Sequence, residues 1–393
     1  MTKKSDAPAI RFKGFSDAWE QRKVQDVADR FDNLRIPVAA NLRVHGTTPY
    51  YGANGIQDYV EGFTHDGEFV LVAEDGANDL KNYPVKCVNG RIWVNNHAHI
   101  LQGKAGIADN SFLAFAISQS DIESLLVGGG RAKLNAETLM SIEFRLPCLQ
   151  EQYRIGEYLT QLDHLITLHQ RKFEKLTNVK KSMLEKMFPQ NGSSYPEIRF
   201  KGFTDPWEQR KLGDVVKEIT RNDPGSEAPI MMITANNGFI EQSERYAFNN
   251  AGESLKKYIL LKKGELAYNH GASKLRPYGS CFALTTAENA RIPFVYHCFS
   301  AENQNAEFMS IELNGAEIEN QLRKIVSSGA RMDGLLNISF DEYTSVSVIL
   351  PGTEEQDRIA DFFRHLDNLI TLHQRELEKL QNIKKSMLEK MFV

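Results

Sequence analysis

The chain has 393 residues, of which 41% are hydrophobic and 25% charged, and its formal net charge at pH 7 is -4. This is an ordinary globular composition, long enough for two or three domains with their own cores. The charge excludes a protein that coats nucleic acid through bulk positive charge. No apolar run approaches the roughly 18 residues of a membrane span. The first residues, MTKKSDAPAIRF, lack the apolar centre of a signal peptide, so we expect a cytoplasmic protein.

In chain order, the first distinctive piece is a block that occurs twice. Residues 8–27, PAIRFKGFSDAWEQRKVQDV, recur as residues 196–215, PEIRFKGFTDPWEQRKLGDV, with 15 of 20 positions identical. An insert follows each copy, at about 28–145 and 216–349, and the two inserts share no obvious identity. The linker 189–195 leads into the same sequence that begins the chain. Joining the C-terminus to the N-terminus would therefore give a nearly cyclic two-fold object.

Both inserts are expected to follow one plan. Strands come first, then a helix that ends at glycine, and finally a strand that runs into a Leu-Pro pair. The dipeptide Asn89-Gly90 between two expected strands predicts a hairpin turn. In the first insert we expect strands at 68–74, 85–88, 91–94 and 141–146 and a helix at 111–127. In the second we expect strands at 230–234, 258–261, 265–268, 280–284, 293–299 and 345–350 and a helix at 316–326.

The second repeated piece predicts a long helix. Residues 163–188 recur as 367–392 with 21 of 26 positions identical, and their apolar residues recur at alternating spacings of four and three. That 3.5-residue period is typical of helices that wrap around a partner helix. His169 and His373 interrupt the apolar seam, and we interpret them as packed polar residues that fix the register, with a pH switch or ligand as the alternative. The expected seam residues are Leu162, Ile166, His169, Phe173, Leu176 and Met183 in the first copy and Leu366, Ile370, His373, Leu377, Leu380 and Met387 in the second.

The predicted fold is therefore α/β (α+β). Two globular domains are separated by a pair of long antiparallel coiled-coil helices, with a pseudo-two-fold internal repeat. Each helix would be roughly 55 Å long at about 1.5 Å per residue, with the inserts at opposite ends of the pair. The expected boundaries are 1–150 for the first globular domain, 151–188 for the central helix, 189–195 for the linker, 196–354 for the second domain and 355–393 for the C-terminal helix.

Familiar catalytic motifs are absent from the sequence. It contains no GxxxxGK[ST], no GxGxxG after a strand, no HExxH, no GxSxG and no Asn-Pro-Pro-aromatic motif. His97 and His99 alternate on an expected strand and would face one side, but surface or groove histidines are favoured over a metal pair. Glu74-Asp75 is interpreted as a turn at a strand end. The four cysteines form no CxxC pair, so we expect neither a metal site nor a catalytic residue.

Several segments carry residue types that read nucleic acid. Asn and Gln bond adenine, Arg and Lys bond guanine, and other polar side chains contact phosphate. Asn-Gly segments are equally typical of tight turns. Arg131 and Arg331 follow glycine-containing helix ends and are either loop arginines in water or phosphate-positioning residues. The candidate DNA-binding residues are Tyr50, Tyr51, Asn54, Asn95, Asn96, His97, Arg131, Lys133, Thr234, Asn236, Asn237, Tyr268, Asn269, His270, Ser273, Lys274, Arg276 and Arg331.

These residues suggest a family. The two copies of RFKGF…WEQRK, the LPxxxEQxRI that begins each helix, and LDxLITLHQRxxEKLxxxKKSMLEKMF resemble the specificity subunit of type I restriction-modification enzymes. YYGANGIQDYV, VLVAEDGAN and VNNHAHIL resemble its target-recognition domains. The resemblance implies a non-catalytic subunit in which each of two target-recognition domains reads one half of a split, asymmetric double-stranded DNA sequence. It also implies that the helices set the spacer and dock modification subunits.

The same resemblance implies the partners. These are two adenine-N6 methyltransferase subunits that use S-adenosylmethionine and restriction subunits that use ATP and Mg²⁺, so we expect no cofactor on this chain. Because the chain is net acidic, we expect partner subunits to supply part of the grip on DNA phosphates. From the repeats alone, the rival is a pseudo-dimeric coiled-coil scaffold whose inserts bind proteins. A stand-alone nuclease or methyltransferase is disfavoured by the missing motifs.

Overall fold

The computed structural model describes residues 8–128, 132–190, 192–235, 238–245, 252–326 and 335–392. The chain divides into two compact units, here named unit 1 (residues 1–172 with 373–393) and unit 2 (residues 173–372). Each unit contains one insert and one part of both long helices. None of the described helices combines the length and apolar composition needed to cross a bilayer.

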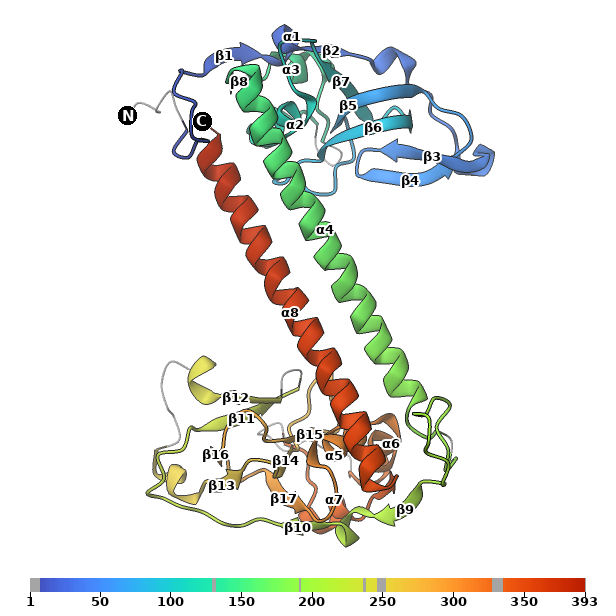
Figure 1. Ribbon diagram of the computed structural model, residues 1–393, viewed down its shortest axis with the longest axis vertical. Helices are drawn as coiled ribbons and strands as arrows, with labels where there is room; N and C mark the ends of the chain where they lie inside the picture. The colour runs from blue at the N-terminus through green and yellow to red at the C-terminus, as the bar shows by residue number, and fades with distance from the viewer. Residues whose placement is uncertain are drawn as a thin grey trace. The chain divides into compact units, whose positions relative to one another are not determined.

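Unit 1 is built on a six-stranded sheet with the order β2-β7-β5-β6-β3-β4 (Figure 1). Its neighbouring strands are antiparallel except β3 and β6, which are parallel. Val70, Val72 and Leu101 from the sheet share a buried core with Phe112 and Ile117 of α2. The elements are β1 (Glu20–Lys23), α1 (Val24–Val27), β2 (Ala28–Arg30), β3 (His45–Gly52), β4 (Gly55–Val60), β5 (His65–Ala73), β6 (Val85–Val94), β7 (Ala98–Gly103), α2 (Asn110–Ser118), α3 (Ala136–Ser141), β8 (Glu143–Leu146) and α4 (Leu149–Lys186).

Two local predictions for the first insert are wrong. β6 runs unbroken from Val85 to Val94, so Asn89-Gly90 is not a hairpin turn. Both predicted arms pair with β5, and Gly90 (φ 93°) lies opposite Gly67 (φ 143°), so glycine supplies the positive φ inside the ladder.

The helix expected at 111–127 also ends early, at Ser118. The hydroxyls of Ser118 and Ser120 donate to the carbonyls of Phe115 and Ala116. Such bonds compete with helix continuation. Beyond them the chain turns and buries Ile122 in the core.

Unit 2 repeats the central topology of unit 1. Its four-stranded sheet has the order β10-β17-β14-β15, which pairs in the same way as β2-β7-β5-β6, so the two inserts share a strand plan. The expected match between their helices is wrong, because the counterpart of α2 is α5 (Ala306–Leu313), which has the equivalent cap, and the helix expected at 316–326 is α6 (Ala316–Ile325). The strand expected at 293–299 is wrong in part, because a turn closed by Tyr296 N–H on Pro293 O separates β16 from β17. The elements are β9 (Glu208–Lys211), β10 (Val216–Glu218), β11 (Met231–Thr234), β12 (Gly238–Glu241), β13 (Ile259–Lys262), β14 (Leu266–Asn269), β15 (Ser280–Ala283), β16 (Asn289–Ile292), β17 (His297–Ala301), α5 (Ala306–Leu313), α6 (Ala316–Ile325), α7 (Phe340–Thr344), β18 (Ser347–Leu350) and α8 (Thr353–Met391).

The repeated block is fixed to the start of each long helix by a buried ion pair. In unit 1, Arg11 Nε and Nη2 donate to the two carboxylate oxygens of Glu151 at 2.9 and 2.7 Å. In unit 2, Arg199 donates to Glu355 at 2.7 and 2.6 Å. The Glu151 and Glu355 side chains are only 1% and 2% exposed. Each pair is therefore a bidentate, charge-assisted contact shielded from solvent.

The glutamine after each of these glutamates holds the insert. Gln152 Nε2 donates to Pro147 O at 2.9 Å, and its Oε1 accepts the N–H of Asp109, the residue that caps α2. Gln356 makes the equivalent bonds to Pro351 O and the N–H of Asn305, the cap of α5. The EQ dipeptide in the repeated sequence thus joins block, helix and insert at one point.

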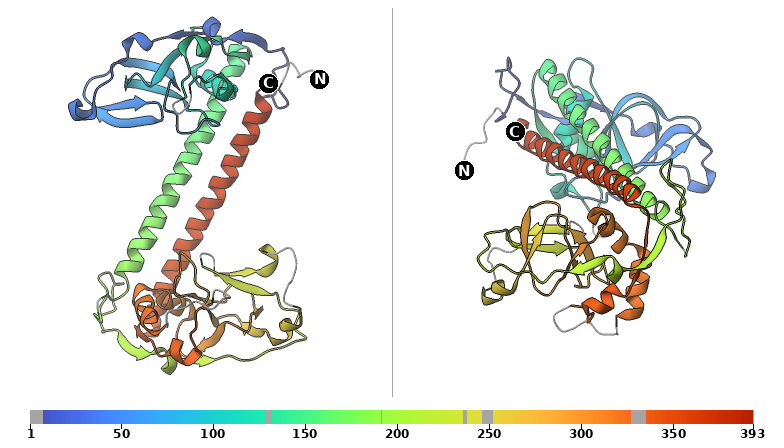
Figure 2. Two further views of the ribbon diagram at one scale, coloured as in Figure 1. Left: turned by 180° about the vertical axis from the view of Figure 1, so that it is seen from behind. Right: turned by 60° about the horizontal axis from the view of Figure 1, so that its bottom comes forward.

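The nearly cyclic relation of the repeats is also seen in unit 1. Ile10 N–H donates to Lys390 O at 3.0 Å, so the N-terminal segment lies beside the end of α8 (Figure 2). In unit 2, Ile198 N–H donates to Lys186 O at 2.9 Å at the end of α4. The chain closes in unit 1 with the bond that the linker makes in unit 2.

α4 and α8 pack antiparallel in both units, as predicted. In unit 1, Lys384 Nζ lies 2.5 Å from the Asp163 carboxylate; in unit 2, Lys180 and Asp367 form the repeat-related ion pair at 2.5 Å. The His169 and His373 rings meet with their Nδ1 atoms 3.2 Å apart. Of the predicted seam residues, Leu162, Leu366 and Leu377 are buried and the other nine are half-buried.

One core position separates the repeats. Glu312 of α5 corresponds to Ala116 of α2, because the caps Asn305 and Asp109 and the ring stacks Phe308–Phe188 and Phe112–Phe392 are equivalent. Glu312 is 8% exposed, and its Oε1 accepts the Ile349 N–H at 3.2 Å. Burial raises the pKa of its carboxyl to about 7.

We predict that Glu312→Gln stabilises the chain at pH 8 and has little effect at pH 4.5. An unfolded carboxyl ionises near pH 4.5, whereas the folded one ionises near pH 7. The cost of the buried charge therefore grows between these values and is complete above pH 7. A shift of this size corresponds to about 3 kcal/mol at most.

Urea unfolding at the two pH values measures the difference. Glu288→Gln, at an exposed glutamate, is the control and should give no such trend. Equal effects of Glu312→Gln at both pH values would contradict the prediction.

Candidate nucleic-acid interface

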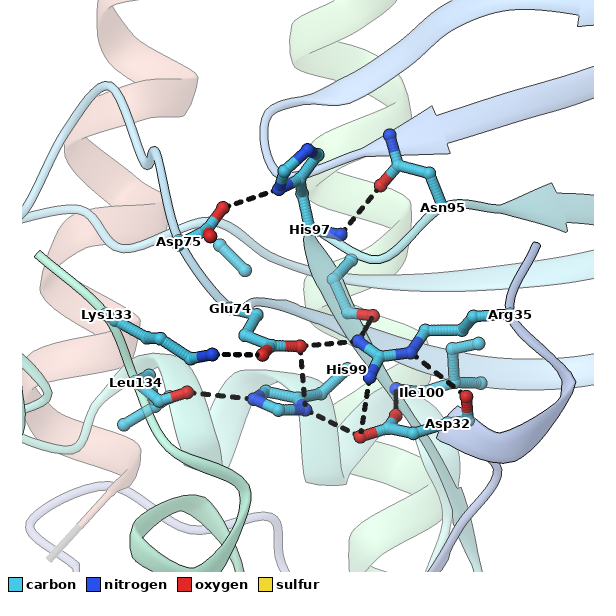
Figure 3. Close-up of polar contacts among 12 residues, drawn as sticks. Asp32, Arg35, Glu74, Asp75, Asn95, His97, His99, Ile100, Lys133 and Leu134 are labelled. Atoms are coloured by element: carbon cyan, nitrogen blue, oxygen red, sulfur yellow. Dashed lines mark hydrogen bonds and ion pairs between the residues drawn. The ribbon is translucent and has the colours of Figure 1, made fainter. Parts of the chain in front are cut away.

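A polar cluster in unit 1 connects four segments of the first insert (Figure 3). Arg35 Nη1 lies 2.5 Å from Glu74 Oε2 and donates to Ala98 O at 2.9 Å. Lys133 Nζ lies 2.8 Å from the other oxygen of Glu74. Burial raises the pKa of Glu74, but Lys133 and Arg35 outweigh it and lower the pKa below its usual value. Glu74 is therefore an anion that ties the residue 133 segment to the sheet.

His99 completes this cluster from below. Its Nδ1 lies 2.7 Å from Asp32 Oδ2, and its Nε2 lies 2.9 Å from Leu134 O. Asp32 also accepts the Ile100 N–H at 2.8 Å. Burial disfavours the Asp32 anion, but the bonds from His99 and Ile100 lower its pKa overall. The cluster consequently holds residues 133 and 134 against the sheet.

Three of the predicted DNA-binding residues lie at the surface beside this cluster. Asn96 is exposed, His97 is about one-third exposed with Nδ1 2.6 Å from Asp75, and Lys133 is about half exposed. Buried Asn95 shapes the loop, because its Oδ1 accepts the His97 N–H at 2.8 Å. We name Asn96, His97 and Lys133 the contact surface of unit 1.

Other predicted residues of the first insert are occupied inside the domain. Tyr50 is buried, its hydroxyl accepts the Val38 N–H at 2.9 Å, and its ring lies under Arg43. Tyr51 is buried as well. Asn54 is exposed, yet its amide donates to Gly76 O and accepts from Asn78 N–H, both at 2.8 Å. These side chains shape the loops, and base contact by them stays a prediction.

The second insert has the same division between packed and exposed residues. Tyr268 stacks on Tyr343 with ring centroids 3.9 Å apart, and Asn269 bonds Ile233 O and Gly271 N–H. His270 is buried. Thr234 donates to Gly238 O across the β11–β12 turn.

Arg276 is held inward as well. It donates to Asn314 O at 2.8 Å, and burial lowers its pKa. Ser273 and Lys274 are exposed, and we name them the candidate contact surface of unit 2. Arg131, Asn236, Asn237 and Arg331 lie outside the described residues.

The segments that flank Arg131 and Arg331 are held alike. Leu134 N–H donates to Glu74 O at 2.7 Å, and Leu336 N–H donates to His270 O at 2.9 Å. In each unit the described segment after Arg131 or Arg331 is bonded to the residue just beyond a central strand, β5 or β14. The two arginines stand at equivalent points of the two inserts in the sequence, and the residues that follow them make equivalent backbone hydrogen bonds.

Sequence reasoning missed the residues that position the contact surface of unit 1. No local sequence pattern indicates Asp32 and Arg35, because their hydrogen-bond partners lie about forty to seventy positions away. Glu74-Asp75 was noticed but interpreted only as a turn. His97 and His99 do not form the considered metal pair, because each ring turns to a different carboxylate. Within the described ranges, no group of three His, Cys, Asp or Glu side chains is arranged to hold a metal ion.

Comparisons with known proteins agree with this architecture. A family model described as the type I restriction modification DNA specificity domain matches residues 16–178. The chain is 31% identical over 366 residues to a type I restriction enzyme specificity subunit of Haemophilus influenzae, covering 90% of this chain and 89% of that protein. It is 24% identical over 409 residues to the MjaVIII specificity subunit of Methanocaldococcus jannaschii, covering 94% and 91%. Its fold is similar to the crystal structure of a type I restriction-modification S subunit from M. genitalium, with a TM-score of 0.67, 13% identity and 98% and 99% coverage.

Proposed function

The chain belongs to the specificity subunits of type I restriction enzymes, and from this premise we propose that each insert reads one half of a split DNA target. The chain is the DNA-recognition component and carries no catalytic residue of its own. The proposal rests on one contrast: the contacts that attach each insert to its long helix are the same in both units, whereas the exposed residues of the two inserts differ. The Arg–Glu and Gln joints are the same in both units, whereas Asn96, His97 and Lys133 have no counterpart in Ser273 and Lys274. Two inserts with different exposed residues, attached to their helices in the same way, suit a DNA target whose two halves differ in sequence.

The net negative charge of the chain indicates that partner subunits contribute to DNA binding. DNA affinity comes largely from phosphate neutralisation, and a chain of net charge -4 supplies little of it. We assign the remainder to two methyltransferase subunits, which would bring S-adenosylmethionine, and to restriction subunits, which would bring ATP and Mg²⁺. A scaffold that binds proteins alone would show no steep loss of duplex affinity with salt, and no feature of the structure favours it.

Each unit offers one equal surface to such partners. In unit 1, Leu165 and Leu168 of α4 are 40% and 38% exposed; in unit 2, Leu369 and Leu372 of α8 are 45% and 52% exposed. The two pairs are related by the 204-residue offset of the repeat. Large apolar side chains spaced three apart share one helix face, and exposed apolar groups on a repeated segment suit a protein contact. We propose that each leucine pair seats one modification subunit.

We predict that replacing residues 28–145 by the insert of another specificity subunit changes one half of the methylated sequence and leaves the other half unchanged. The joints at Arg11, Glu151 and Gln152 flank the exchanged segment and keep its mounting. Methylome sequencing of a host that carries the hybrid and its partner subunits reads both halves directly. A change in both halves, or in neither, would refute separate reading by the two inserts.

We predict that Asn96→Ala relaxes preference at one base pair of the half-site read by the first insert. Loss of a bidentate amide contact removes about 1–3 kcal/mol of discrimination. Competition among single-base-pair variants of the target, with the assembled enzyme, measures it. Lys274→Ala is the matched control, because it lies on the other insert and should leave this half-site unaffected. Unaltered preference in Asn96→Ala would show that Asn96 reads no base.

We predict that the double variant Leu165→Asp/Leu168→Asp assembles with one modification subunit instead of two. A carboxylate in place of leucine would be desolvated without a partner in the contact. Native mass spectrometry counts the bound subunits. Thr167→Asp, at an exposed position on a different face of the same helix, is the control and should retain both. Full assembly by the double variant would move the docking surface elsewhere.

A further inference from the structure

The contact between the two long helices in unit 1 includes a pair of histidines whose ring nitrogens converge. His169 of α4 and His373 of α8 place their Nδ1 atoms 3.2 Å apart, with ring centroids 5.1 Å apart and planes at 68°. The two positions are related by the 204-residue offset, so each copy of the repeat supplies one imidazole. Neither ring is part of the contact surfaces described above, and the DNA-recognition role does not use them.

The distance between the two nitrogens suits a shared metal ion. Zinc binds imidazole nitrogen at about 2.0–2.1 Å, which places two ligands of a tetrahedral site roughly 3.3–3.4 Å apart. The observed separation of 3.2 Å is within a small side-chain adjustment of that value. Because the rings come from different helices, an ion between them would cross-link α4 to α8.

Metal binds the neutral form of imidazole. Both rings are half-buried, so water can complete the coordination sphere.

The charged groups around the pair are not equivalent in the two repeats. Lys172 is exposed, and by the repeat its position in α8 is taken by Glu376. Glu376 lies three residues after His373, on the same helix face. Its carboxylate is 3.9 Å from Lys379 in this structure and 40% exposed. A carboxylate at this position would offset part of the repulsion that Lys172 would exert on a bound ion.

We propose that His169 and His373 form a two-histidine site for a borderline divalent transition-metal ion such as Zn²⁺, with water in the remaining positions. Imidazole ligands suit Zn²⁺, Ni²⁺ and Cu²⁺ and do not suit Mg²⁺ or Ca²⁺. The ion would fasten the helix pair where its apolar seam is interrupted. The alternative is a hydrogen bond between the two rings with no affinity for metal.

Calorimetry of the full-length chain without a histidine tag, titrated with ZnCl₂ at pH 7.5, tests the proposal. We expect one saturable ion per chain and a higher melting temperature in its presence. Affinity should fall as the pH is lowered through the usual imidazole pKa of about 6.5, because protons compete for the same nitrogens. Glu376→Gln should bind more weakly than the natural chain.

The variants His169→Asn and His373→Asn should each abolish the saturable binding. Asn is tolerated at polar seam positions of helix pairs, and circular dichroism checks that the helices persist. His164→Asn/His365→Asn is the matched control, because both residues are exposed on the same two helices, and it should bind as the natural chain does. Unchanged binding in the His169 or His373 variants would overturn the proposal.

A second measurement does not depend on the variants. Electron paramagnetic resonance of the natural chain with one equivalent of Cu²⁺ should show coupling to two imidazole nitrogens. Absence of saturable Zn²⁺ binding, or a Cu²⁺ spectrum without paired nitrogens, would establish the plain hydrogen bond between the rings.

Discussion

The buried pair of arginine and glutamate at the start of each long helix is the contact on which the rest of the structure depends. Glu151 and Glu355 are almost fully buried, and each is neutralised by an arginine from a distant block of the sequence. Removing one member of such a pair leaves an isolated buried charge at a cost of about 3–5 kcal/mol. The pair therefore fixes where the repeated block meets the helix, and β1 and β9 can then pair with β8 and β18.

The residues that attach the first insert to α4 are different from the exposed residues that we propose contact DNA. Arg11 pairs with Glu151 at the start of α4, and Gln152 bonds Pro147 O and the N–H of Asp109. Asn96 and His97 lie between β6 and β7 and Lys133 pairs with Glu74, so these three residues take no part in the joint. The mounting needs only a helix cap at Asp109 or Asn305 and a strand that ends in Leu-Pro. An insert that keeps these features can change its exposed loops without disturbing the helices.

The features that could be predicted from the sequence are those carried by its internal repeats and by the periodicity of its apolar residues. The duplicated helix located α4 and α8 to within two residues at each end, because the apolar period and the Leu-Pro pair before each helix are local signals. The histidines of the seam were expected to be packed, and they are. The strand plan that the inserts share was visible from the order of their elements, and the equivalent four-strand sheets of the two units bear it out, whereas the two predicted helices are not equivalent.

What could not be predicted depends on contacts between distant segments. Asn89-Gly90 has the composition of a hairpin, but β5 is long enough to pair with both arms and keeps β6 straight through Gly90. Tyr50, Asn54 and Asn95 are residue types that read DNA, but Val38, Gly76 and Gln57 of β4 take up their polar groups. The sequence names residue types that suit recognition. Only the fold says which of them are already occupied, as it also does for Arg35 and Asp32.

The two repeats differ at points where a perfect two-fold protein would be constrained. Ala116 has become the buried acid Glu312, and Lys172 has become Glu376 beside the histidine pair. In a true homodimer each such change would occur twice, so a costly group such as a buried carboxylate would double its penalty. Fusion of both copies in one chain lets each half accept its own substitution. The same freedom allows the two inserts to diverge, so the loss of exact symmetry in the helices and cores and the asymmetry of the recognised DNA have one origin.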